Sequence, residues 1–566
     1  MRPVEPFLHQ PRIAYFSMEI ALHSDIPTYS GGLGVLAGDT VRTAADLELP
    51  LVGVTLISRM GYFRQEIDPQ GRQIEHPDPW NPDRWAVPLE AKVAVPIGER
   101  MVWVQAWLYV LEGGTDYTVP VVLLDTDLPD NSPEDREITH YLYGDGDEYR
   151  LKQEIVLGIG GARMLQALGF HIHTYHMNEG HSALLALELL RRFERSADTI
   201  GPGESIYNVP EVRERCLFTT HTPVEAGHDQ FDYPLVHALL DDMVDLGELR
   251  KLAGPERLNM TRLALNLSGY VNGVAKRHAE TSTALFPGHR VHAITNGVHP
   301  PTWAAPSFAR LYDARLPEWR HEAEILLRAD QIPDDEIWAA HVAAKQALID
   351  TVKRLTGTEL SLQLPIVGLA RRMTAYKRPN LLFEDLERLQ RIAGQYPFQI
   401  VIAGKAHPHD EPGKKLIEQL HHHMRALQDR IPCVFLPDYD MALGLSLVSG
   451  SDMWLNTPLR PLEASGTSGM KAALNGVPHV SVLDGWWVEG CMEGVTGWSI
   501  GNDDAGEDGR HDGAALYEKL ETTILPLYYT DRVGWLRVMK GAISKNAPYF
   551  NSHRMMRRYA ADAYIR

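Results

Sequence analysis

Short apolar runs alternate with helical patterns along almost the whole chain, and this alternation constrains the fold more than any other feature. Helical patterns cover 147–168 and 182–196. Runs rich in β-branched residues, which predict strands, occupy 50–56, 117–126, 216–222, 290–297, 365–372, 398–406, 433–439, 453–458 and 479–485. Because helices separate the strands, the pattern predicts βαβ units and parallel sheets.

The strand runs fall into two series, one in each half of the chain. A length of 566 residues exceeds the roughly 250–300 residues that one hydrophobic core supports. We therefore expect two doubly wound α/β domains, with ligands bound at the carboxyl ends of the strands. Three prolines in NGVHPPTWAAPSF (296–308) interrupt both periodicities and mark the boundary. The last residues, 541–566, predict a turn and then a terminal helix.

Charge and cysteine content restrict the class of partner and compartment. The chain has 74 acidic and 55 basic residues, a net charge of −19, which argues against nucleic acid or an anionic membrane as the main partner. Cys216, Cys433 and Cys491 are too few and too scattered for a disulfide framework. The chain contains no run of about 18 apolar residues, so no membrane-spanning helix is expected. A cytoplasmic protein is expected.

A glycine-rich stretch, YSGGLGVLAGD, stands where a loop meets a helix. Its glycines are Gly31, Gly32 and Gly34. Free backbone N–H groups at such a junction can hold a phosphate. A tight turn that packs one helix closely is the alternative, and the spacing alone leaves both open.

Basic residues gather directly after one predicted strand, in ARRMTAYKRPN (370–380). Arg371, Arg372, Lys377 and Arg378 follow the apolar run PIVGL. Arginine can donate two parallel hydrogen bonds to a phosphate, and lysine adds a compact charge. The position at a strand end favours an anion site over a solvated basic face.

The stretch EASGTSGMK runs from Glu463 to Lys471 and consists mostly of small residues between these two. Such a loop lets backbone N–H groups approach an oxyanion closely. The lysine supplies either a charge for a phosphate or an amine for a Schiff base. A glycine-rich turn that caps a helix is the alternative.

Histidines also follow strands. His221 stands near the end of the run CLFTTHT, and Asn178, Glu179 and His181 follow another apolar segment. A histidine there can donate to a sugar hydroxyl, or it can be a satisfied structural residue. The histidines of FHIHTYH lack a matched carboxylate or cysteine set, so no metal site is expected.

Taken together, the motifs resemble those of the α-glucan (glycogen, starch and maltodextrin) phosphorylase family, in a short form. The resemblance rests on YFSMEIALHSDIPTYSGGLGVLAGD, LYGDGDEYRLKQE, FTTHTPVEAGHDQF, SGYVNGVAKRHAE, ITNGVHPPTW, RRMTAYKRP and EASGTSGMKAALNG. It covers nearly the whole chain. It implies two Rossmann-like doubly wound domains facing a cleft, the GT-B glycosyltransferase architecture. The expected division is 1–303, 304–540 with the cofactor, and a helix in 541–566 that returns to the N-terminal domain.

The resemblance also implies an activity and a cofactor. The family carries out reversible phosphorolysis of α-1,4-glucan ends, which releases α-glucose 1-phosphate with retention. It carries pyridoxal 5′-phosphate (PLP) as a Schiff base on the lysine that matches Lys471. The PLP phosphate acts as a proton relay rather than the ring acting as an electron sink.

Site residues follow by matching motif positions. The catalytic set is Lys471, Arg372, Lys377, His221 and Glu463. The cofactor set is Lys471, Thr467, Ser468, Arg371 and Tyr439. The substrate set is Gly31, Gly32, Gly34, Asn178, His221, Asn296, Arg372, Lys377, Glu463, Ser465 and Gly466.

Partners and alternatives complete the expectations. The implied partners are an α-1,4-glucan, inorganic phosphate and α-glucose 1-phosphate, and the family's habit is a homodimer. The family's long N-terminal regulatory extension is missing, so allosteric control is not expected. A nucleotide-sugar-dependent glucan synthase and a catalytically inactive glucan-binding protein remain alternatives. A two-carboxylate hydrolase fits less well, because the motifs supply cations.

Overall fold

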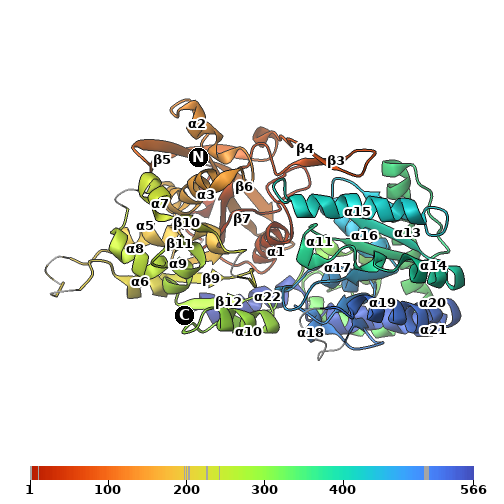
Figure 1. Cartoon of the computed structure of the whole chain (residues 1–566). Helices are drawn as coiled ribbons and strands as arrows, with labels where there is room; N and C mark the ends of the chain where they lie inside the picture. The colour runs from red at the N-terminus through yellow and green to blue at the C-terminus, as the bar shows by residue number, and fades with distance from the viewer. Residues whose placement is uncertain are drawn as a thin grey trace.

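The computed structural model describes residues 3–10, 12–196, 198, 200–201, 204–224, 227–240, 243–501 and 509–565. The chain is a mixed α/β structure with one large sheet in each half (Figure 1). No helix in these ranges is both long enough and apolar enough to cross a membrane.

The sheet of the first half has nine strands among the described residues, in the order β13-β12-β9-β8-β1-β2-β7-β6-β5. Its strands are β1 (Ile13–Ser17), β2 (Leu51–Leu56), β5 (Val87–Ile97), β6 (Arg100–Glu112), β7 (Thr118–Asp125), β8 (Thr174–Asn178), β9 (Cys216–Thr219), β12 (Tyr270–Gly273) and β13 (His292–Ala293). Strands β13 to β7 are parallel, and β6 and β5 extend the edge in antiparallel pairing.

The sheet of the second half is parallel throughout, in the order β16-β15-β14-β17-β18-β19. Its strands are β14 (Ile366–Ala370), β15 (Gln399–Ala403), β16 (Cys433–Leu436), β17 (Met453–Asn456), β18 (His479–Val482) and β19 (Gly497–Ile500). Every residue of β14 and β15 is buried. Strands covered on both faces are apolar throughout, which is why the sequence pattern located them well.

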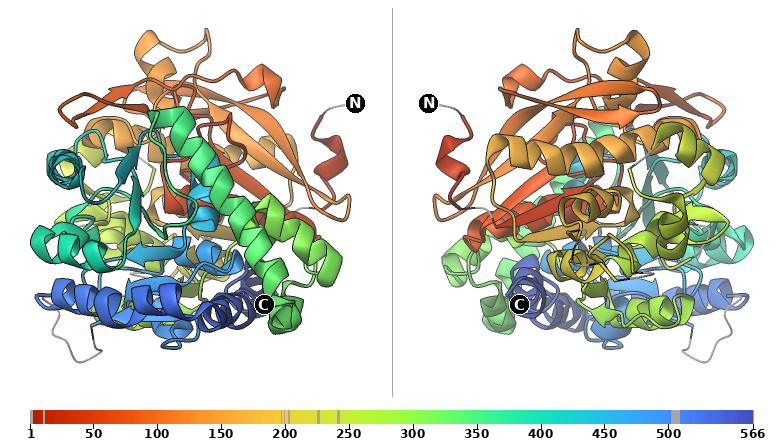
Figure 2. Two further views of the ribbon diagram at one scale, coloured as in Figure 1. Left: turned by 90° about the vertical axis from the view of Figure 1, so that its right-hand side faces the viewer. Right: turned by 90° about the vertical axis from the view of Figure 1, so that its left-hand side faces the viewer.

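Helices connect and cover both sheets (Figure 2). The first half contains α1 (Gly32–Asp46), α2 (Pro133–Arg136), α3 (Gly146–Ile155), α4 (Gly161–Leu168), α5 (Leu185–Arg192), α6 (Val209–Arg215), α7 (Tyr233–Leu239), α8 (Leu246–Ala253), α9 (Met260–Asn266) and α10 (Lys276–Leu285). The remainder contains α11 (Pro300–Trp303), α12 (Pro306–Arg315), α13 (Asp334–Thr356), α14 (Leu386–Gln395), α15 (Glu411–Leu427), α16 (Met441–Gly450), α17 (Ser468–Leu474), α18 (Trp487–Gly490), α19 (Asp512–Lys519), α20 (Leu525–Thr530), α21 (Arg532–Gly541) and α22 (Ser552–Tyr559).

Most predicted elements are confirmed, and several are shorter or less regular than predicted. The helical pattern at 147–168 is one continuous run, in which a π-helical turn (Val156–Gly160) separates α3 from α4. The pattern at 182–196 is α-helical only in α5. The apolar run at 290–297 contributes only the two-residue strand β13, at the edge of the sheet.

Several segments of the described chain link the halves, and three of them bury apolar residues or join the two sheets by hydrogen bonds. Trp303, Phe308 and Tyr312 follow β13 and are buried in the core of the second half. Helix α22, near the C-terminal end of the chain, packs against the first half. Its residues Met556 and Tyr559 lie in one hydrophobic cluster with residues of β1 and α1. The hairpin of β3 (Arg64–Ile67) and β4 (Gln73–His76) reaches β15, and its glutamines donate to the carbonyls of Gly404 and Ala406 at 2.9 Å.

Candidate active site

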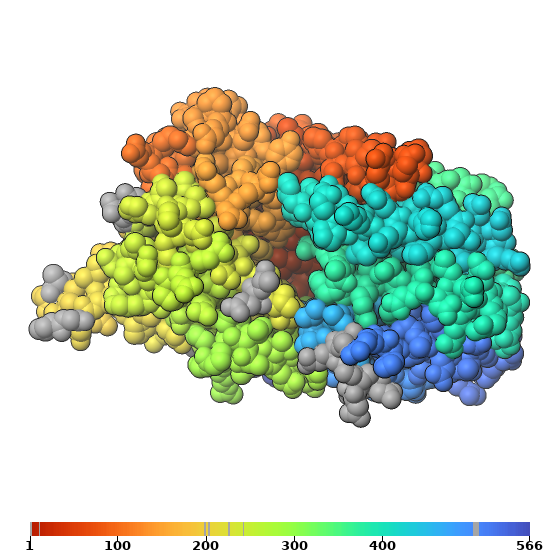
Figure 3. Space-filling view, in the orientation of Figure 1, coloured from red at the N-terminus to blue at the C-terminus, as the bar shows by residue number. Residues whose placement is uncertain are grey.

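A pocket with about 610 Å³ of space opens between the two halves. Figure 3 shows the hollow, with atoms of the N-terminal segment visible at its floor. Most of the predicted site residues line it: Gly31, Gly32, His221, Asn296, Arg371, Arg372, Lys377, Tyr439, Glu463, Ser465, Gly466, Thr467, Ser468 and Lys471. Gly34 and Asn178 lie behind this lining. The strand ends therefore bring together residues that are hundreds of positions apart in the sequence.

Lys471 lies in α17, after the loop of small residues. Gly466 has φ of +74°, a conformation that favours glycine. A Cβ on Gly469 would lie 2.7 Å from the ring of His479, so the second glycine permits close packing. Burial lowers the pKa of Lys471 to about 8, although the Asp39 carboxylate raises it. An amine with this pKa is partly uncharged near neutral pH and can attack a carbonyl carbon.

Two cations share one carboxylate at the entrance to this loop. Glu463 accepts a hydrogen bond from Arg371 Nη2 at 2.8 Å and one from Lys377 Nζ at 2.7 Å. Burial raises the pKa of Glu463, but Lys377 and Arg371 outweigh it and bring the pKa below its usual value. Arg371 Nε and Nη1 are buried without a hydrogen-bond partner in the described structure. A buried guanidinium with two unused donors is suited to receive an anion.

Arg372 and the start of α1 face each other across the pocket. The Arg372 side chain is exposed to it, and its Nη2 lies 3.5 Å from the place where a Cβ on Gly31 would stand. A Cβ on Gly32 would meet no atom within 4 Å, so the backbone there borders open space. A ligand phosphate can therefore approach both the guanidinium and the first backbone groups of the helix.

Gly34 has a packing role. A Cβ there would lie 2.6 Å from Glu19 Oε2 and 2.7 Å from Tyr29 Cβ.

Glu19 is a site residue that was not predicted from the sequence motifs. Its carboxylate accepts hydrogen bonds from the backbone N–H of Ser30 at 2.5 Å and from the hydroxyl of Tyr143 at 2.8 Å. The one signal in the sequence was a carboxylate within an otherwise apolar segment.

His221 and Asn178 act as a pair. His221 Nε2 lies 2.7 Å from Asn178 Oδ1, and the Asn178 amide donates to Ser17 Oγ at 3.0 Å. The backbone N–H of His221 donates to Glu179 Oε2 at 2.8 Å. Burial lowers the pKa of His221 to about 4, so the ring is neutral at physiological pH. Asn178 thus orients a neutral histidine that itself lines the pocket.

Further polar side-chain atoms lie in the lining of the pocket, and some of them have no hydrogen-bond partner in the described structure. Asn296 Oδ1 and Ser465 Oγ are buried without a hydrogen-bond partner among the described residues. Ser468 Oγ accepts from Trp454 Nε1 at 3.0 Å. Unpaired buried oxygens are costly in an unliganded protein, and ligand hydroxyl groups can satisfy them.

Comparison with known proteins gives concordant matches. The model of a protein family described as carbohydrate phosphorylase matches residues 237–496. A maltodextrin phosphorylase of Thermococcus litoralis is 38% identical over 98% of this chain and 70% of its own length. A glycogen phosphorylase of Aquifex aeolicus is 36% identical over 98% and 86%, and one of Mycobacterium tuberculosis is 36% identical over 98% and 70%.

Proposed function

The chain belongs to the carbohydrate phosphorylase family, and from this premise we propose that it is an α-glucan phosphorylase. It transfers the glucosyl unit at the non-reducing end of an α-1,4-glucan to inorganic phosphate and releases α-glucose 1-phosphate with retention, in a reversible reaction. One observation carries the assignment: Lys471, Arg371, Arg372 and Lys377 converge with Glu463 in a single pocket between the two sheets.

We propose the GT-B architecture for the fold, with two Rossmann-like domains at 1–303 and 304–540. The parallel pairing of strands β13 to β7 in the first sheet and of all strands in the second supports this division, as does the pocket lined by residues at their strand ends. The helix within 541–566 returns to the N-terminal domain in this proposal. The hydrogen bond between Tyr564 and His176 at 2.8 Å supports that placement.

The residues present fit PLP as the cofactor. Lys471 offers a buried amine with a lowered pKa, and Arg371 offers two guanidinium nitrogens without a partner. We propose that Lys471 holds PLP covalently and that Arg371, Thr467 and Ser468 hold its phosphate, with Tyr439 beside it. When bound, PLP supplies a phosphate that exchanges a proton with the substrate phosphate.

The remaining cations hold inorganic phosphate. Arg372 faces the open start of α1 at Gly32, and Lys377 lies 2.7 Å from Glu463. In the proposed reaction, phosphate held there protonates the glycosidic oxygen and the bond to the leaving glucan breaks. An oxygen of the same phosphate then bonds to the anomeric carbon from the same face, which gives retention. Positive groups placed where negative charge develops contribute several kcal/mol to such a step.

Neutral groups orient the sugar. We propose that the glucose hydroxyls bond to His221, Asn296, Ser465 and the backbone at Gly466, all of which line the pocket. Asn178 holds His221 in position. Glu463 completes the set as a hydroxyl acceptor. Because Nε2 of the neutral ring donates its one proton to Asn178 Oδ1, Nδ1 is left to accept a hydrogen bond from a glucose hydroxyl without adding charge to the site.

An assay with maltodextrin tests the function. Purified protein supplied with PLP and inorganic phosphate should release glucose 1-phosphate, and omission of phosphate should stop the release. Glucose released without phosphate would indicate a hydrolase, and glucan extension from a nucleotide sugar would indicate a synthase. Binding of maltodextrin with no turnover would support the inactive glucan-binding protein.

We also propose a cytoplasmic homodimer. Cys216, Cys433 and Cys491 are free thiols, which is consistent with a reducing compartment. The dimer follows from the family resemblance alone, and light scattering coupled to gel filtration tests it.

A further inference from the structure

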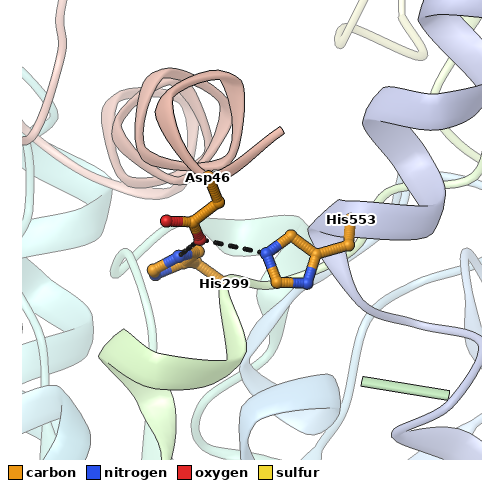
Figure 4. Close-up of side chains that lie close together, drawn as sticks. All are labelled: Asp46, His299 and His553. Carbon is orange, nitrogen blue, oxygen red and sulfur yellow. Dashed lines mark hydrogen bonds and ion pairs between the residues drawn. The ribbon is translucent and has the colours of Figure 1, made fainter. Parts of the chain in front are cut away.

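Asp46, His299 and His553 meet outside the pocket that holds Lys471 (Figure 4). They come from three separate segments: Asp46 ends α1, His299 immediately precedes α11, and His553 lies in the first turn of α22. Each offers one ligand atom, and these atoms lie within 4.8 Å of one another. In the described part of the chain, no other group of histidine, cysteine and carboxylate side chains converges in this way.

The geometry is close to that of a metal site. Asp46 Oδ2 lies 2.7 Å from His299 Nε2 and 3.0 Å from His553 Nε2. In a tetrahedral zinc site, with metal–ligand bonds of about 2.0–2.2 Å, neighbouring ligand atoms lie about 3.3 Å apart. To reach that spacing, Asp46 Oδ2 would move about 0.3 Å away from His553 Nε2 and about 0.6 Å away from His299 Nε2. The two imidazole nitrogens lie within 4.8 Å of each other.

Outer hydrogen bonds hold two of the three ligands. His299 Nδ1 lies 2.7 Å from Thr302 Oγ1, which directs Nε2 toward Asp46. Asp46 Oδ1 accepts a hydrogen bond from the backbone N–H of Gly114 at 2.9 Å. Metal-binding histidines and carboxylates are commonly fixed by such second contacts.

The chemistry of the cluster favours a cation, because it offers one carboxylate oxygen and two imidazole nitrogens. The neighbouring guanidinium of Arg42 lies 3.8 Å from Asp39 and is paired with that carboxylate.

An approach path leads to the cluster. Asp46 and His299 line a second pocket with about 380 Å³ of space, together with Arg42, Tyr109 and Glu112. The His553 side chain is fully buried and does not line this pocket. Two ligands thus face a cavity that can admit an ion and supply a water molecule as a fourth ligand.

We propose that Asp46, His299 and His553 bind one divalent ion of the zinc class (Zn²⁺, Co²⁺ or Ni²⁺). Two imidazole nitrogens and one carboxylate select these ions over Mg²⁺ and Ca²⁺, which prefer oxygen ligands. The ion links α1, the segment between the two sheets and the C-terminal helix. Its role is structural, because Lys471 and the cations of the candidate active site are not among its ligands.

Metal quantification tests the site. Protein loaded with PLP is treated with a chelator, freed of it, incubated with Zn²⁺ and passed through a desalting column before elemental analysis. We expect about one equivalent of zinc in the wild type and in His422→Gln, which changes an exposed histidine of α15. Asp46→Asn and His553→Gln should bind at least tenfold more weakly. Zinc should raise the Tm of the wild type but not that of these two variants.

The spectrum of the cobalt-substituted wild type gives a readout that does not depend on the variants. Four-coordinate Co²⁺ with imidazole ligands absorbs visible light much more strongly than the hydrated ion. Strong absorption that excess Mg²⁺ does not displace would support the site, even if Asp46→Asn or His553→Gln failed to fold. Absence of this absorption, or zinc retained equally by folded Asp46→Asn and His553→Gln, would overturn the proposal.

Discussion

The ammonium nitrogen of Lys471 lies 3.6 Å from the centre of the Trp303 ring. The indole N–H of Trp303 donates to both carboxylate oxygens of Asp39, at 3.0 and 2.9 Å. The same carboxylate accepts from the backbone N–H of His299 at 3.2 Å. One indole therefore connects α1 of the first half with the lysine of the second, and Lys471 is positioned by both halves.

Removal of this indole donor should destabilise the protein. Trp303→Phe keeps an aromatic ring beneath Lys471 but leaves buried Asp39 without the indole donor. We expect a loss of about 1–3 kcal/mol in the free energy of unfolding, measured by urea denaturation. Trp103→Phe, at an exposed position of β6, serves as the control and should cost less than about 0.5 kcal/mol. Equal effects of the two changes would contradict the role of the Trp303–Asp39 contact.

Glu463 and Lys377 should be energetically coupled. Glu463→Gln leaves Lys377 and Arg371 close together without their shared anion, whereas Lys377→Met leaves Glu463 paired with Arg371. A double-mutant cycle on unfolding free energy should therefore show about 0.5–3 kcal/mol of interaction. Lys405→Met is the matched control, because Lys405 lines the same pocket but pairs with Asp438. Its effect should add to that of Glu463→Gln, and additivity for Lys377 as well would refute the shared ion pair.

Arg372 should contribute to phosphate binding and little to stability. Its side chain is exposed to the pocket and has no hydrogen bond or ion pair within the described structure. We expect Arg372→Gln to reduce kcat/KM for inorganic phosphate at least 100-fold, as loss of a charge-assisted contact in the transition state does. The urea midpoint should stay within error of the wild type. Arg64→Gln, on an exposed position of β3, is the control and should leave phosphorolysis unchanged.

Acid should destabilise the fold through buried neutral histidines. Burial lowers the pKa of His176 and His479 to about 3 and that of His221 and His278 to about 4. The unfolded chain, with histidine pKa values near 6.5, then binds more protons than the native state below that pH. Above about pH 6.5 these histidines are neutral in both states and do not reduce the free energy of unfolding. As the pH decreases from 6.5 toward 4, only the unfolded chain takes up the protons, so the free energy of unfolding falls.

Replacement of one of these histidines measures its contribution to the pH dependence of the free energy of unfolding. His479 packs against Trp486 and Trp487, so His479→Phe removes the titrating group and keeps an aromatic ring. The acid-side slope of unfolding free energy should become shallower by about 1.4 kcal/mol per pH unit between pH 4.5 and 6. An unchanged slope would show that His479 is not held neutral. His422→Gln should leave the slope as it is.

Much of the fold was predictable because its strands are buried on both faces. The run PIVGL became β14, and the cations after it, Arg371 and Arg372, reached the pocket as strand-end residues do. The antiparallel hairpin of β5 and β6 was not predicted, because its outer positions are exposed and its apolar residues alternate with polar ones. The length of strand β13 was overestimated, because this strand lies at the edge of the sheet and pairs with β12 over only two residues.

Contacts between distant segments could not be predicted. Trp303 and Asp39 are 264 positions apart, and no spacing rule relates them. The same holds for Asp46 and His553, which become neighbours only when the C-terminal helix packs on the first half. Glu19 was missed for a different reason: its partners include the backbone N–H groups of Ser30 and Gly31, which leave no trace in the side-chain pattern.

Reduction with borohydride followed by digestion and mass spectrometry tests the central claim most directly. The account predicts a phosphopyridoxyl adduct on Lys471 in protein supplied with PLP, and no adduct at that position in Lys471→Arg. An adduct confined to other lysines, or no adduct in folded protein saturated with PLP, would contradict the assignment of this pocket as a PLP-dependent phosphorylase site.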